Sequence, residues 1–228
     1  MQKLPSPFVL IKKSIDTFFV KENLILFLKV YAPLATLSAL SGVFIYIPSL
    51  TTFFESLAGR IFTNTFNVLF ILITVFVNLA GVIVISKIVN GEKISFKSAF
   101  KIALKKFWKF LLLSILIYLL YILGLILLVV PLTIFSTWFA FSRFIMVEKN
   151  SSIKNSFRES KNLVKGIFWK VLVRNIVFGL FYIVSEMLLA VVPYGTGTII
   201  VGLLGGLYVL PTYLLYKDIC QNRELSLT

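Results

Sequence analysis

The chain has 228 residues, of which 59% are hydrophobic and only 14% are charged. Water-soluble domains carry roughly 25% charged residues, so this composition excludes an ordinary soluble fold and favours a protein embedded in lipid. The net charge is +14, with 23 lysines and arginines against 9 aspartates and glutamates. We attribute this excess of positive charge to loops beside a membrane. We expect membrane lipids with anionic headgroups as partners and no nucleic acid partner.

The predicted fold class is all-α, a polytopic transmembrane helix bundle of about six spans with cytoplasmic amphipathic interfacial helices. About 20 mostly apolar residues are needed to cross a membrane. The predicted spans cover residues 24–47, 67–86, 110–130, 132–147, 167–192 and 198–216 of a single domain, 1–228. As one helix, the apolar stretch 110–147 would be about 57 Å long, so we expect a turn at Pro131.

The positions of the basic residues predict the orientation of the chain. With the N-terminus in the cytoplasm, Arg60 is the only lysine or arginine that falls on the outer side. Loops rich in these residues stay in the cytoplasm, so the bias predicts that both ends face the cytoplasm. We expect a multi-pass protein of the cytoplasmic membrane of a prokaryote.

Three cytoplasmic segments have the pattern of amphipathic helices that lie at the membrane surface, and they cover residues 7–22, 95–109 and 152–165. In the second, Lys97, Lys101 and Lys105 form a row at i, i+4 and i+8. Such lysines repel one another, and an anionic surface offsets this by about 1 kcal/mol per residue. The alternative is a solvated helix packed on the bundle. The basic residues expected to contact lipid in the third segment are Lys154, Arg158, Lys161 and Lys165.

Two of these segments are similar in sequence. Ser95 to Phe100 matches Ser152 to Phe157, and Phe107-Trp108-Lys109 recurs as Phe168-Trp169-Lys170. This suggests an internal repeat, each unit being a surface helix followed by two spans. The alternative is independent use of aromatic and basic residues as anchors at the interface.

A resemblance appears between Phe144 and Trp169, where Val147-Glu148-Lys149 is followed by Ser156, Ser160 and Leu163-Val164-Lys165-Gly166. Together with the Pro131 turn and the 213–218 segment, this pattern resembles a group of poorly characterised prokaryotic six-span membrane proteins. The group includes the membrane domain of some glycerophosphodiester phosphodiesterases. Their soluble catalytic domain has no counterpart here, so the resemblance implies architecture alone.

Four polar residues fall inside predicted spans, where they are costly unless they have a role: Arg143, Arg174, Asn78 and Glu186. They are candidates for contact with a substrate or a lipid phosphate. The alternatives are that both arginines extend to the cytoplasmic headgroups and that Glu186 meets Arg60.

Two further features have structural interpretations. We expect Glu148 to pair with a nearby cation. Gly202 and Gly206 form a GxxxG motif, which predicts close packing of two helices.

The residue inventory excludes several catalytic and metal sites. The absence of histidine rules out histidine-based metal sites and a serine–histidine pair. The two aspartates, Asp16 and Asp218, lie outside the expected core, and the single cysteine, Cys220, cannot form a disulfide within the chain. We therefore predict that the protein is not an enzyme and has neither a metal site nor a cofactor.

The leading hypothesis is a membrane protein that interacts with lipids or with membrane-protein partners through its basic cytoplasmic surface. The alternative is a small transporter. In that case Pro33, Pro211 and the Gly202–Gly206 cluster would interrupt helices around a site lined by Arg174 and Asn78.

Overall fold

The computed structural model describes residues 4–46, 56–127, 129–192 and 196–224. In these ranges the chain forms helices and no strand, and six helical segments are long and apolar enough to cross a membrane, which confirms the predicted all-α fold with about six potential spans. The helices are α1 (Pro7–Phe18), α2 (Lys21–Tyr46), α4 (Leu57–Val89), α5 (Phe96–Ile126), α6 (Val129–Trp138), α7 (Ser142–Lys149), α8 (Ile153–Val164), α9 (Phe168–Ala190), α10 (Thr196–Leu203) and α11 (Gly205–Glu224).

Serine side chains fix the start of α1, α4, α5 and α8. Each accepts a hydrogen bond from the backbone N–H three residues later, which satisfies one of the free donors of the first helical turn. These serines are Ser6, Ser56, Ser95 and Ser152. Gly91 and Gly166 adopt positive φ angles of 76° and 84° just after α4 and α8, where the chain turns toward the next helix.

Helix α5 corrects the expected division between a surface helix, 95–109, and a span, 110–130. The structure has one uninterrupted helix across this boundary. Neither proline nor glycine occurs between Phe96 and Leu123, so nothing in the sequence breaks the backbone hydrogen-bond pattern there. The predicted surface helix is therefore the first half of α5.

The fourth predicted span, 132–147, consists of two helices, α6 and α7, separated by a break at 139–141. Ser160 of α8 lies in this break, where its hydroxyl donates to the Trp138 carbonyl at 2.7 Å and accepts from the Phe141 N–H at 3.2 Å. The break therefore leaves these backbone groups paired. Pro131 lies in the first turn of α6, where its missing N–H has no partner to lose.

Helix α8 buries two serines together with an apolar residue. Its fully buried row is Ser156, Ser160 and Val164, whereas Ile153 and Phe157 are half-buried. The serines are buried because their hydroxyls bond backbone carbonyls, Ser156 within α8 at 2.9 Å and Ser160 at the α6–α7 break.

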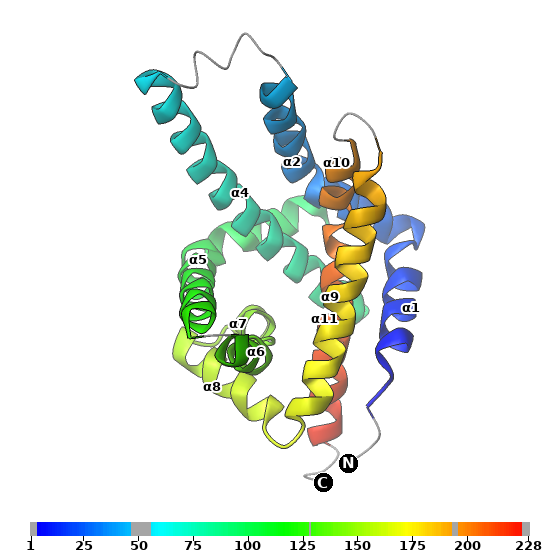
Figure 1. Ribbon diagram of the computed structural model, residues 1–228. Helices are drawn as coiled ribbons and strands as arrows, with labels where there is room; N and C mark the ends of the chain where they lie inside the picture. The colour runs from blue at the N-terminus through cyan, green and yellow to red at the C-terminus, as the bar shows by residue number, and fades with distance from the viewer. Residues whose placement is uncertain (1–3, 47–55, 128, 193–195, 225–228) are drawn as a thin grey trace.

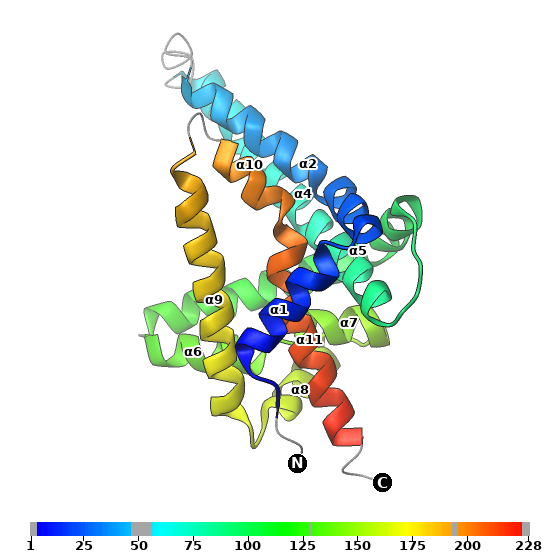
Figure 2. The same cartoon turned by 90° about the vertical axis from the view of Figure 1, so that its right-hand side faces the viewer.

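Helices α1, α9 and α11 run side by side, and α2 crosses α4 and α10 (Figure 1). The start of α1, the end of α11 and the α8–α9 turn lie at one end of the molecule (Figure 2). The last turns of α2 and the first turns of α4 and α10 lie at the opposite end (Figures 1 and 2). The direction of the chain thus reverses repeatedly between the two ends.

Candidate functional site

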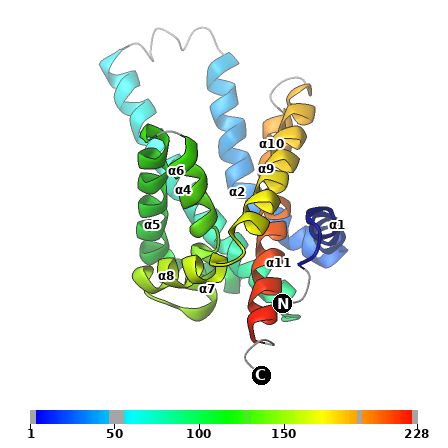
Figure 3. The same cartoon turned by 60° about the horizontal axis from the view of Figure 1, so that its bottom comes forward.

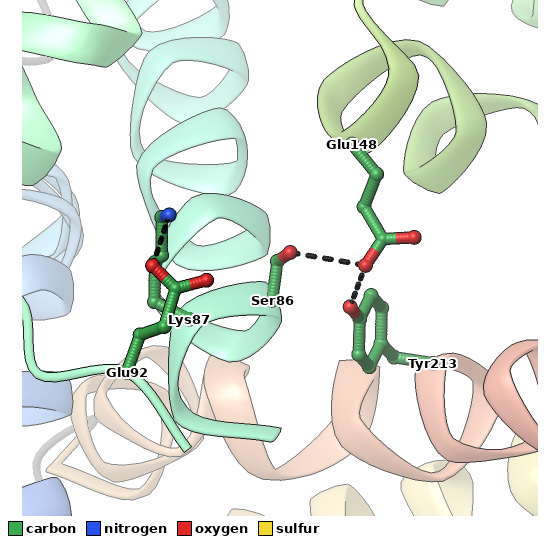
Figure 4. Close-up of polar contacts among 5 residues, drawn as sticks. All are labelled: Ser86, Lys87, Glu92, Glu148 and Tyr213. Atoms are coloured by element: carbon green, nitrogen blue, oxygen red, sulfur yellow. Dashed lines mark hydrogen bonds and ion pairs between the residues drawn. The ribbon is translucent and has the colours of Figure 1, made fainter. Parts of the chain in front are cut away.

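A half-buried carboxylate, Glu148 of α7, is the centre of a polar junction between three helices. Its Oε1 accepts hydrogen bonds from the hydroxyls of Ser86 of α4, at 3.1 Å, and Tyr213 of α11. Lys217 of α11 lies 3.4 Å from the same oxygen. Figure 4 shows the hydroxyls of Ser86 and Tyr213 pointing at the carboxylate from two different helices, α4 and α11. The ion pair confirms the prediction that Glu148 meets a nearby cation.

The junction is positioned by buried aromatic packing. Phe144, one turn before Glu148 on α7, packs edge-on against Tyr213 with ring centroids 5.3 Å apart, and it lies 5.9 Å from the ring of Tyr216. Because these rings are almost fully buried, the carboxylate is held at the edge of the core, with 14% of its side chain exposed. A carboxylate in such a place is stable only when it is paired and hydrogen-bonded.

A cavity of about 460 Å³ opens beside this junction. Five charged residues line it: Lys87, Lys106, Lys217, Glu92 and Glu148. Lys87 and Glu92 form an ion pair at 2.6 Å, whereas Lys106 donates to the Val147 carbonyl at 2.7 Å and makes no ion pair with any described carboxylate. Lys106 is therefore the ammonium group in this cavity that is available to an incoming anion.

The lysine row of α5 is exposed. Lys97, Lys101 and Lys105 make neither an ion pair nor a hydrogen bond within the described part of the chain. On the same face, Trp108 is 76% exposed and Leu112 is 50% exposed. One helix face therefore passes from cations through tryptophan to apolar side chains, which is the order found across a membrane–water interface.

The same order occurs at the start of α9. Trp169 is 73% exposed, and Val173 and Ile176 follow on the exposed apolar side. Phe107 and Phe168 each pack against the following tryptophan, with centroids 5.4 and 5.5 Å apart. The two Phe-Trp pairs thus have similar ring spacing, although the angle between the rings is 63° in α5 and 86° in α9.

The basic residues of α8 are partly engaged. The ammonium of Lys161 lies 4.3 Å from the centre of the Trp138 ring, a cation–π contact, and Arg158 donates to the Asn155 side chain at 3.2 Å. Lys154 and Lys165 are exposed. The α5 row is therefore the better candidate for lipid contact.

Arg174 fastens the N-terminal segment to α9. Its guanidinium donates to the carbonyls of Leu4 at 3.0 Å, of Pro5 at 2.6 and 3.0 Å, and of Lys170 at 2.8 Å. All three nitrogens are used in this contact, which gives Arg174 a structural role.

The other intramembrane candidates are scattered. Arg143 lies 5.8 Å from the Tyr118 ring centre, and Asn78 donates to the Thr74 carbonyl of its own helix at 2.8 Å. Glu186 is exposed, and the ion pairs among described residues do not join it to Arg60. The four polar residues predicted from the sequence therefore do not form one site.

The glycine motif lies against α2. A Cβ on Gly206 would come within 2.6 Å of the Phe27 ring, and one on Gly205 within 2.4 Å of the Tyr31 ring. Gly202 has looser packing, 3.7 Å from the Ala35 Cα. The absence of side chains at Gly205 and Gly206 thus allows α2 and α11 to approach closely.

Three residues of this junction and its cavity were not predicted from the sequence: Ser86, Tyr213 and Lys106. Serine and tyrosine occur in many helices without a shared role, so their types alone gave no signal. The spacing of Tyr213 and Lys217, one helical turn apart, was the available indication that both could face one carboxylate.

No family model, curated protein or solved structure matches this chain. The resemblance to the six-span membrane domains therefore stays a prediction.

Proposed function

We propose that the protein is a non-catalytic, multi-pass membrane protein that binds anionic lipid headgroups through a basic surface on the first half of α5. The observation that carries this proposal is the exposed row of Lys97, Lys101 and Lys105, which meets no carboxylate among the described residues and ends at exposed Trp108.

Electrostatics supports this assignment. Three ammonium groups on one helix face repel one another, and none of the described carboxylates pairs with them. Anionic lipids supply that charge at about 1 kcal/mol per lysine near the surface. The cavity beside Lys106 adds a fourth ammonium on the same helix. In this proposal, Trp108 lies at the level of the headgroups and the remainder of α5 enters the hydrocarbon core.

The test measures lipid selectivity of the purified, full-length protein in nanodiscs made from phosphatidylcholine and phosphatidylglycerol. Native mass spectrometry counts the lipids that stay bound as detergent removes the others. We expect enrichment of phosphatidylglycerol on the wild type. The triple variant K97Q/K101Q/K105Q should lose affinity by about a hundredfold, because three contributions of about 1 kcal/mol disappear.

The matched control is K12Q/K13Q/K21Q, which removes the same charge from three exposed lysines of α1 and the start of α2. We expect this control to retain the enrichment. An equal loss in both triple variants would show that net charge alone attracts the lipid, and full retention in the α5 variant would also contradict the proposal.

A second candidate function, a small transporter, is favoured by two interrupted spans, at 139–141 and at Leu204. Interrupted helices frequently surround transport sites. Arg174 and Asn78 do not supply such a site, because they bond the N-terminal segment and α4 itself. Flux of candidate solutes into proteoliposomes tests this function, and no flux above that of protein-free vesicles would reject it for those solutes.

A further inference from the structure

A second cavity, of about 490 Å³, lies between α5, α6, α9 and α11. None of the described residues that line it is charged, in contrast to the cavity beside Glu148. Helices α6 and α9 lie side by side (Figure 3). The polar residues that line the cavity include Tyr121, Thr133, Ser136, Asn175, Tyr182 and Tyr208.

The lining has unused hydrogen-bond acceptors. The Asn175 Oδ1 is buried and has no hydrogen-bond partner in the described part of the chain. The hydroxyls of Thr133 and Ser136 donate to carbonyls of their own helix, at 2.7 and 3.1 Å, so their lone pairs remain free to accept. The Tyr208 hydroxyl, also in the lining, is likewise buried without a hydrogen-bond partner among the described residues. Buried polar groups without partners are unfavourable, which indicates that a group able to donate to Asn175 Oδ1 completes this site.

The cavity contains real space beside α9. A Cβ added to Gly179 would meet no atom within 4 Å, although Gly179 lines the cavity. Asn175 and Gly179 follow Trp169 by about 9 and 15 Å along the helix axis. With Trp169 at the interface, Gly179 lies near the middle of a hydrocarbon core of about 30 Å. The site is therefore polar at a depth where a free solute meets little water.

The cavity borders the lipid-facing surface of the protein. Ile176 lines it and is 52% exposed, and Leu180 and Ile183, farther along α9, are 54% and 50% exposed. An acyl chain can lie along these side chains while its polar head enters the cavity. A charged headgroup has no counter-ion in this lining, and its burial at this depth is unfavourable.

We propose that this cavity binds the headgroup of an uncharged, hydroxyl-bearing membrane lipid of the diacylglycerol class. The lipid hydroxyl donates to Asn175 Oδ1, and the tyrosine and threonine hydroxyls surround the glycerol. This proposal is independent of anionic lipid binding by α5.

The test uses the full-length protein in phosphatidylcholine nanodiscs that contain a photoactivatable diacylglycerol. Cross-linked peptides are identified by mass spectrometry, and unlabelled diacylglycerol or phosphatidic acid is added as competitor. We expect labelling of α6 and α9 beside the cavity, competed by diacylglycerol and not by phosphatidic acid. Equal competition by phosphatidic acid, or uniform labelling of all lipid-facing helices, would overturn the proposal.

Two variants locate the site. Asn175→Leu removes the unpartnered acceptor, and Gly179→Leu fills the space while it replaces glycine with a better helix former. Asn175→Leu should reduce specific labelling by about tenfold, the effect of one lost buried hydrogen bond. Gly179→Leu should reduce it at least as much, because its side chain occupies the space that the headgroup needs. Wild-type labelling in both variants would reject the cavity as the site.

The matched control is Asn78→Leu, the same substitution in a span that does not line the cavity, and it should label like the wild type. Loss of labelling in this control, at an unchanged amount of folded protein, would contradict the assigned location. If the Gly179→Leu variant does not fold, Tyr208→Phe takes its place: it removes a single hydroxyl from the lining and is expected to lower labelling severalfold.

Discussion

Glu148 is bound by more groups than any other described carboxylate. The hydroxyls of Ser86 and Tyr213 and the ammonium of Lys217 share its Oε1, so α4, α7 and α11 meet at one atom. The exposed pair Lys87–Glu92 is different, because the side chains are 37% and 53% exposed and water can replace either partner. Glu148 therefore contributes more to the stability of the fold than Glu92 does.

Replacement of Glu148 by alanine is expected to lower the free energy of unfolding by about 3 kcal/mol. Two hydroxyls and an ammonium lose their common acceptor at a site with little access to water. The measurement is thermal unfolding in detergent. Tyr213→Phe should lower the stability by about 1 kcal/mol, since one hydrogen bond is lost. Glu92→Gln, the exposed control, should change it by less than about 0.5 kcal/mol, and a loss in the control equal to that of Glu148→Ala would contradict this ranking.

Arg174 connects the segment before α1 to α9 through a planar group that lysine cannot reproduce. We expect Arg174→Lys to speed amide hydrogen exchange across 4–18, with little change in α4. Arg158→Lys is the control, because Arg158 bonds only its own helix neighbour Asn155 among the described contacts. Unchanged exchange at α1 in Arg174→Lys would show that the N-terminal segment is held by other contacts.

At the scale of helices, the space around a glycine differs from one position to another. A Cβ on Gly124 of α5 would lie 2.7 Å from the Leu132 Cα of α6, and backbone cannot move aside as a flexible side chain can. A Cβ on Gly179 would meet nothing within 4 Å. Two glycines in apolar helices thus have opposite surroundings.

Gly124→Ala should therefore destabilise the protein by about 1–3 kcal/mol, the usual effect of overpacking. Gly179→Ala should stabilise it by about 0.5–1 kcal/mol, because alanine has the higher helix propensity and no clash opposes it. Thermal unfolding of both variants under the same detergent conditions checks the signs. Two shifts of the same sign would refute the assigned packing at one of the positions.

The helices themselves could be predicted from apolar length, and the reversal near Pro131 from the thickness of a membrane. The break at 139–141 could not be located from the sequence, because phenylalanine and alanine, the residue types at Phe139, Ala140 and Phe141, are common inside helices. Ser160, distant in sequence, pairs the backbone groups that the break exposes. Likewise, Glu148 was expected to find a cation, whereas its hydroxyl donors come from α4 and α11 and depend on tertiary packing.

At the scale of the whole molecule, the exposed Trp108 and Trp169 and the shared end of α1, α11 and the α8–α9 turn have a common explanation. In the proposed orientation, this end faces the cytoplasm, and Trp108 and Trp169 lie at one membrane interface. The basic residues of α5 and α8 then lie on the side where positive charge is retained. Arg60, at the first turn of α4, lies on the other side.

Single cysteines test this orientation in a Cys220→Ser background, in which no thiol remains. The positions Lys12, Lys93, Lys154 and Arg60 are all exposed. A membrane-impermeant maleimide applied to intact cells should label only Arg60→Cys, and permeabilised cells should show labelling at all four. The Cys220→Ser protein without an added cysteine gives the background. Labelling of Lys154→Cys from outside would place α8 beyond the membrane. In that case α6 and α7 would not make a crossing between α5 and α8, and the proposed six-span orientation would be wrong.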